Sequence, residues 1–141
     1  MFRKILLALD LTDKHDAAVR CAADLARQNQ GTVILLHVVE LIPGLERAEE
    51  MPFYDRLEQL ARAHLARTAV DLARDKIDCR SHVIVGNRAP ATIAFAAEQG
   101  VDLIVLTSPP FHPEHPASSL GSMAWKVSLV APCPVLLVKN E

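Results

Sequence analysis

The residues best suited to bind a charged ligand lie in one proline-rich stretch, residues 107–123. Gly121 and Ser122 stand where a helix is expected to begin, and free backbone N–H groups at a helix start favour an anion. The prolines of the stretch have no N–H group to offer a phosphate; they are Pro109, Pro110, Pro113 and Pro116. We therefore expect room for one anion and not for a chain of phosphates. In a simpler interpretation, Ser118 or Ser119 merely caps the helix, a role that serine favours.

The same stretch contains His112, Glu114 and His115, whose side chains carry the donor atoms of zinc ligands. A tetrahedral zinc site usually needs a fourth ligand, and two histidines spaced in this way outside a helix have little specificity. We expect no metal site. The sequence leaves open whether His112 and His115 bind a metal or respond to pH. His37 lies inside an apolar run and is expected to be a hydrogen-bonded core histidine.

No pairing of a nucleophile with a base stands out in the sequence. Serine, histidine and aspartate occur in no order that indicates a catalytic triad. Cys133 lies between two prolines, a position typical of a structural residue. A small hydrolase or a metal-dependent enzyme that uses residues 107–122 is therefore the weakest of three candidate functions, and we predict that the protein is not an enzyme.

Short apolar runs alternate with amphipathic segments along the chain, and this alternation predicts the elements that position these residues. The first helix is expected to be capped by Thr12 or Asp13 and the second to extend from Phe53 to about Asp75. In the second helix the apolar spacing predicts a buried stripe formed by Leu57, Leu60, Ala61, Leu65, Ala69 and Leu72. A third helix carries Pro90 in its first turn and ends at Gly100, and a fourth covers about 119–130. The predicted strands cover residues 4–9, 32–39, 79–85, 103–106 and 135–138.

This order of elements predicts a single α/β domain over residues 1–141. Connections this short between strands and helices imply a doubly wound, five-stranded parallel sheet with helices on both faces. The first and fourth strands are strongly apolar and belong at the centre, whereas polar residues in the third indicate an edge. We therefore predict the strand order 3-2-1-4-5. A ligand then belongs beyond the carboxyl ends of strands one and four, where the strand order reverses.

Composition excludes several classes of function. The formal net charge of -2 and the pI near 6.3 give no positive surface for nucleic acid. No apolar run approaches the length of a membrane span or of a signal peptide, so we expect a cytoplasmic protein without a membrane partner. The three cysteines have no spacing that indicates a disulfide framework.

Several segments occur together in one known family. Residues 4–10 read KILLALD, residues 36–38 read LHV, and residues 102–105 read DLIV. Residues 120–122 read LGS, and the chain closes with APCPVLLV at 131–138. With these segments the chain resembles the universal stress protein family over nearly its whole length, and the resemblance implies the same doubly wound fold.

The resemblance also implies a nucleotide site that has lost part of its motif. Family members that bind ATP carry a glycine, two residues, a second glycine, nine residues, and then Gly-Ser or Gly-Thr. Counted back from Gly121, the two glycines belong at positions that hold Ser108 and Phe111 here. The matching positions imply that Asp10 holds the ribose and that the backbone of Val38 meets adenine. The full set of implied site residues is Asp10, Val38, Thr107, Gly121, Ser122 and Met123.

Three functions follow from this combination. The first is a non-catalytic regulatory or interaction module of the stress response with weak or no ATP binding and an unidentified protein partner. The alternative is an ATP- or AMP-binding switch that uses Asp10, Val38 and the helix start at Gly121 and Ser122. The third is the enzyme considered above. The lost glycines favour the first function, and we expect no bound cofactor.

Two further expectations concern contacts. The last strand is apolar on both faces yet lies at an edge of the predicted sheet. The resemblance implies that it pairs with a second copy, giving a homodimer through Val135, Leu136, Leu137 and Val138. Phe111 is expected to fill the vacated nucleotide site between strands one and four as a plug.

Overall fold

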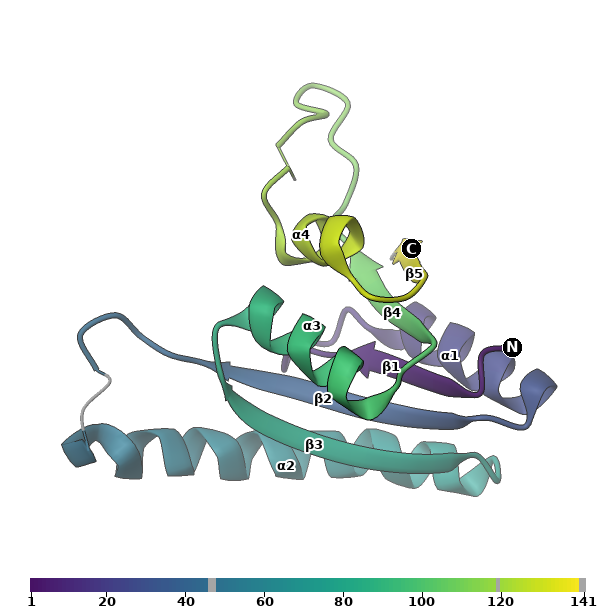
Figure 1. The fold of residues 1–141 in the computed structure, drawn as a ribbon, viewed down its shortest axis with the longest axis horizontal. Helices are drawn as coiled ribbons and strands as arrows, with labels where there is room; N and C mark the ends of the chain where they lie inside the picture. Colours follow the sequence, from purple (N-terminus) through teal and green to yellow (C-terminus); the bar gives the residue numbers. More distant parts are fainter. Residues whose placement is uncertain (46–47, 119, 140–141) are drawn as a thin grey trace.

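The computed structural model describes residues 1–45, 48–118 and 120–139 (Figure 1). A short 3-10 helix, η1, precedes α2, and the remaining helices and strands alternate along the chain. In chain order the elements are β1 (Lys4–Ala8), α1 (Asp16–Asn29), β2 (Thr32–Glu40), η1 (Ala48–Glu50), α2 (Met51–Arg74), β3 (Asp78–Gly86), α3 (Arg88–Gln99), β4 (Leu103–Ser108), α4 (Met123–Val130) and β5 (Val135–Lys139).

The five strands form one parallel sheet in the order β3-β2-β1-β4-β5, which confirms the predicted topology. β1 is the centre: Ile5 is paired with Val33 of β2 on one side and with Leu103 of β4 on the other. These three side chains are almost fully buried because helices cover both faces of the sheet. β3 is an edge strand, as its exposed Arg80 predicts.

Two helices cover each face of the sheet (Figure 1). On one face, alanines of α1 and the side chains of Tyr54 and Leu65 from α2 pack against the sheet. On the other face, Phe95 of α3 and Val127 of α4 pack against Leu6 and its neighbours. Helices on both faces were predicted, and the arrangement confirms it.

The first helix begins later than the sequence predicts. Its N-cap position is His15, whose side chain makes no capping hydrogen bond, and neither Thr12 nor Asp13 caps it. The reason is local: both the backbone N–H and the hydroxyl of Thr12 donate to Asp10 instead. Such a side-chain turn competes with a helix start and delays it.

The start of α4 is also later than predicted. The chain between β4 and α4 projects from the body of the domain and returns to it (Figure 1). Ser122 is the N-cap, and its Oγ accepts from the backbone N–H of Trp125 at 3.2 Å. Ser118 is not the cap, because its N–H donates to the carbonyl of His115 in a turn; Ser119 lies outside the described residues. Gly121 has φ +91°, which separates that turn from the helix and which residues other than glycine rarely adopt.

Among the described residues, no helix combines the length and the apolar character that a membrane span requires.

Candidate functional site

A cavity of about 410 Å³ opens beyond the carboxyl ends of β1, β2 and β4, at the point where strand order reverses. This is the place that the parallel topology predicts for a ligand. The first residue of α3 and the first turn of α4 close its sides. The wall consists of Ala8, Leu9, Asp10, Lys14, His15, Leu36, His37, Val38, Arg88, Thr92, Leu106, Thr107, Ser108, Pro109, Pro110, Ser122, Met123 and Ala124.

Most of the site residues implied by the family resemblance meet in this cavity. Asp10, Val38 and Thr107 come from three neighbouring strands or the loops that follow them. Ser122 and Met123 come from the start of α4. Gly121 does not line the cavity; its left-handed backbone sets the direction in which α4 begins. The Ser122 hydroxyl accepts from Trp125, so it serves the helix as a cap while it lines the cavity.

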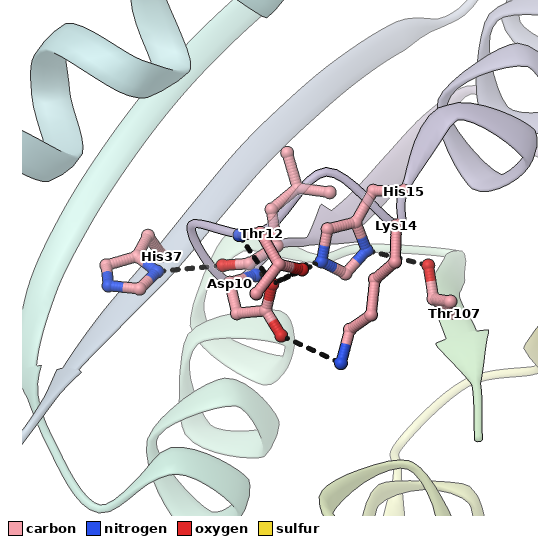
Figure 2. Close-up of polar contacts among 7 residues, drawn as sticks. Asp10, Thr12, Lys14, His15, His37 and Thr107 are labelled. Atoms are coloured by element: carbon pink, nitrogen blue, oxygen red, sulfur yellow. Dashed lines mark hydrogen bonds and ion pairs between the residues drawn. The ribbon is translucent and has the colours of Figure 1, made fainter. Parts of the chain in front are cut away.

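Asp10 is held by a dense set of donors (Figure 2). Its Oδ1 accepts from the backbone N–H of Thr12 at 3.0 Å and from the Thr12 hydroxyl. The same oxygen lies 2.6 Å from Nε2 of His15, and Oδ2 lies 3.1 Å from Nζ of Lys14. Oδ1 is therefore saturated, and a ligand hydroxyl is left with Oδ2.

These contacts decide the charge of Asp10. Partial burial by itself raises the pKa of the carboxyl group, but the hydrogen bonds from Thr12, His15 and Lys14 lower it by more. The net result is a pKa well below the ordinary value for aspartate, so the group is a carboxylate at neutral pH. The cavity therefore contains a fixed negative charge on one wall.

His15 is the main site residue that the sequence interpretation missed. Its ring is buried, with the whole residue 9% exposed, and it bridges Asp10 to Thr107 of β4 (Figure 2). Nδ1 lies 2.7 Å from Oγ1 of Thr107. The only signal in the sequence is a histidine five residues after Asp10, and nothing in that spacing shows that the side chain turns inward.

The ionised carboxylate fixes the tautomer of His15. A carboxylate only accepts hydrogen bonds, so the 2.6 Å contact requires a proton on Nε2. The backbone N–H of Asp10 also lies 3.3 Å from Nε2, but this contact is not a hydrogen bond when Nε2 carries a proton. In the neutral ring Nδ1 is then an acceptor, and the Thr107 hydroxyl donates to it.

Two cationic residues also line the cavity. Lys14 is paired with Asp10, whereas Arg88 makes no ion pair with any residue that the structure describes. Both are exposed and carry long side chains, so each can reach an anionic group at the cavity mouth. Arg88 is a second residue for which the sequence interpretation assigned no role.

The loop after β4 faces the cavity with proline. Pro109 and Pro110 line it, and neither has an N–H group. Lys139 of β5 holds this part of the loop: its Nζ donates to Oγ of Ser108 at 2.8 Å and to the carbonyl of Pro109 at 3.3 Å. These two residues of the loop therefore offer no backbone N–H group to a ligand in the cavity.

Phe111 does not fill the cavity. The side chain is 69% exposed and is absent from the cavity wall, so the predicted plug is wrong. The physical reason is that the loop between β4 and α4, which carries Phe111, projects from the body of the domain (Figure 1). The cavity remains open to a ligand.

His37 is hydrogen-bonded to the backbone, and the thiols of Cys79 and Cys133 are partly buried. His37 donates from Nδ1 to the carbonyl of Leu9 at 2.8 Å, as expected of a hydrogen-bonded histidine in a strand. Within residues 1–45, 48–118 and 120–139, no three His, Cys, Asp or Glu side chains are arranged to hold a metal. Burial, reinforced by the charge of Asp78, raises the pKa of the Cys79 thiol to about 11, and burial also raises that of Cys133. Both thiols are weak nucleophiles at neutral pH.

Comparison with known proteins agrees with this architecture. The universal stress protein A homolog 1 of Coxiella burnetii is 30% identical over 141 residues, covering 97% of this chain and 96% of the relative. The universal stress protein UspA of Lactobacillus plantarum has a similar structure, with a TM-score of 0.79 at 22% identity over 99% of this chain and 98% of its own.

Two similar structures contain a nucleotide. A universal stress protein from Archaeoglobus fulgidus in complex with dAMP gives a TM-score of 0.70 at 22% identity, with both chains fully covered. A universal stress protein in complex with cAMP gives a TM-score of 0.73 at 18% identity, over 99% of this chain and 98% of the other chain. At these identities the structural likeness shows the shared fold.

The family assignment rests on the sequence as well as on the fold. The model of the universal stress protein family matches residues 1–139, and therefore includes every strand of the sheet and every residue that lines the cavity. The chain belongs to the universal stress protein family.

Proposed function

We propose that this protein is a non-catalytic regulatory module of the stress response that binds ATP weakly or not at all. One observation carries the proposal: the loop after β4 lines the cavity with Pro109 and Pro110, which have no N–H group to donate to a phosphate. Three free cysteine thiols suit a reducing compartment, and we place the protein in the cytoplasm. The module acts through a protein partner that its sequence does not identify.

The cavity nevertheless suits a smaller ligand of the same kind. The backbone of Val38 is available to a purine, Oδ2 of Asp10 to a ribose hydroxyl, and Arg88 to one phosphate. The ligands of the two nucleotide complexes, dAMP and cAMP, each carry a single phosphate. We therefore propose that any nucleotide bound here is an adenine nucleotide with one phosphate.

The alternative to a regulatory module with weak or no ATP binding is a switch that holds ATP or AMP. The convergence of Asp10, Val38 and Ser122 on one cavity favours that alternative.

Calorimetric titration with adenosine, AMP and ATP with Mg²⁺ tests this proposal. We expect AMP to bind more tightly than ATP, since additional phosphates meet proline where donors are needed. Arg88→Gln is expected to weaken the binding of AMP by about tenfold, because a hydrogen bond to a charged group contributes roughly 1.5–3 kcal/mol. Adenosine binding should not change in that variant.

Arg80→Gln is the matched control, because Arg80 is an exposed arginine of β3 that does not line the cavity. It should leave AMP binding unchanged. Micromolar binding of ATP that disappears in Asp10→Ala would overturn the proposal and favour the ATP switch.

We also propose that the protein acts as a homodimer formed through β5. This strand is paired with β4 on one side only, and Leu137 is 40% exposed at the edge. Trp125, Leu129 and Val130 of the neighbouring α4 are exposed as well. An unpaired apolar edge strand readily pairs with another chain, and a second copy offers the same edge.

Light scattering on a sizing column measures the mass directly. We expect twice the chain mass of 15.4 kDa for the native protein. Leu137→Lys should shift it to the monomer, because a charge would be buried in the interface. Leu60→Lys is the control: Leu60 is 63% exposed on α2, away from β5, and its substitution should leave the dimer intact. A native monomer at micromolar concentration would contradict the proposal.

A further inference from the structure

A chain of hydrogen bonds crosses the cavity wall from a carboxylate to a hydroxyl (Figure 2). Oδ1 of Asp10 lies 2.6 Å from Nε2 of His15, and Nδ1 of His15 lies 2.7 Å from Oγ1 of Thr107. Asp10 lies just after β1, His15 is the N-cap of α1, and Thr107 is the next-to-last residue of β4. An acid that orients an imidazole, which in turn contacts a hydroxyl, is the arrangement that activates a nucleophile.

The proton positions suit that role. Asp10 is a carboxylate and holds the proton on Nε2, which leaves Nδ1 as the acceptor of the Thr107 proton. The other hydroxyls have different acceptors: those of Thr12 and Thr32 donate to carboxylates, and those of Thr92 and Ser128 donate to carbonyl groups of their own helices. Thr107 instead contacts a ring nitrogen of a histidine, and it lines an open cavity.

The cavity indicates the class of electrophile. Lys14, Arg88 and Thr107 line the same cavity, and Arg88 adds a positive charge beyond the Lys14–Asp10 pair, so an anionic group is attracted into the cavity that contains the hydroxyl. The remaining wall is largely apolar, with Leu36, Leu106 and other aliphatic side chains. A small acyl phosphate combines an apolar acyl group, an electrophilic carbonyl and an anionic leaving group. We propose that Thr107 is a self-acylation site for small acyl phosphates, with His15 as its base and Asp10 as a positioning residue.

The step balances without a further reagent. The Thr107 hydroxyl attacks the carbonyl carbon of the acyl phosphate while its proton passes to Nδ1 of His15. The new bond joins Oγ1 to the carbonyl carbon, and the bond from that carbon to the phosphate oxygen breaks. Inorganic phosphate leaves and takes the proton from His15. The product is a threonine ester, which marks the protein covalently.

This inference does not depend on nucleotide binding. A covalent mark that accumulates once per chain suits a regulatory module, and the reaction consumes an acyl donor without turning over ATP. Failure of the calorimetric titrations would remove the nucleotide proposal and leave the acylation untouched. Absence of acylation would leave the nucleotide proposal standing.

Acetyl phosphate is the probe, and mass spectrometry of the intact protein and of its peptides is the readout. We expect one acetyl group on Thr107 after incubation of the native protein. Because Lys14 and other amines also react with acetyl phosphate, the ester is identified by its release with alkaline hydroxylamine, to which lysine amides are resistant. Inorganic phosphate should slow the reaction by competing for the cations.

Variants show whether acetylation of Thr107 depends on its hydrogen bonds through His15 to Asp10 or is a chance reaction. His15→Gln is expected to slow acetylation of Thr107 by about 100-fold or more, the usual size of a general-base contribution. Thr107→Val should abolish the ester while preserving shape, and Thr107→Ser should retain it, which also controls for folding. Asp10→Asn should slow the reaction at saturating acetyl phosphate. Acetylation of lysines alone, or an equal rate at Thr107 in native protein and His15→Gln, would overturn the proposal.

Discussion

Replacing Pro109 and Pro110 by alanine, together with Ser108→Gly and Phe111→Gly, is expected to raise the affinity for ATP with Mg²⁺ by about 100-fold or more. The two alanines restore backbone N–H groups at positions that line the cavity. A hydrogen bond to a charged group contributes roughly 1.5–3 kcal/mol, and each 1.4 kcal/mol changes affinity about tenfold. The two glycines allow the loop to approach the phosphates closely. Isothermal titration calorimetry measures the gain.

Two control variants identify the cause of such a gain. Ser108→Gly with Phe111→Gly alone should do much less, because the prolines still withhold their donors. Pro113→Ala with Pro116→Ala changes prolines of the same loop that do not line the cavity, and it should leave ATP affinity unchanged. If the double glycine variant reached the full gain, proline would not be the obstacle and backbone conformation would be.

The fold was predictable because its signals are local. Mostly apolar runs such as residues 32–39 occur where helices cover both faces of a sheet, and Ile34 and Leu36 are almost fully buried. Polar residues mark β3 as an edge, and Arg80 is exposed there. Element boundaries were less predictable, since Thr12 has the chemistry of a helix cap but is engaged by Asp10.

The site was predictable only in part. Parallel strands end at the same edge of the sheet, so the convergence of Asp10, Val38 and Thr107 follows from topology. The role of His15 does not, because its contact with Thr107 joins residues 92 positions apart. Phe111 shows the opposite failure: apolar character suggested burial, but the loop that carries it projects from the domain.

Leu65→Ala is expected to lower the free energy of unfolding by about 2–5 kcal/mol, the range measured for fully buried leucines. Leu65 is 0% exposed and packs in the core between α2 and the sheet. Truncation removes apolar contacts and leaves a cavity that the surrounding strands cannot fill completely. Urea unfolding, followed by circular dichroism, gives the change from the midpoint and slope.

Leu60→Ala on the same helix is the matched control. The apolar spacing of α2 placed Leu60 on the buried stripe, but this was wrong: the side chain is 63% exposed. Successive helical residues are about 100° apart, so Leu60 lies beside the line formed by Ala61 and Leu65 and faces solvent. Its truncation should change the free energy of unfolding by no more than about 0.5 kcal/mol. A loss comparable to that of Leu65→Ala would mean that α2 is covered in solution, and the homodimer would then have to be sought on this face as well as at β5.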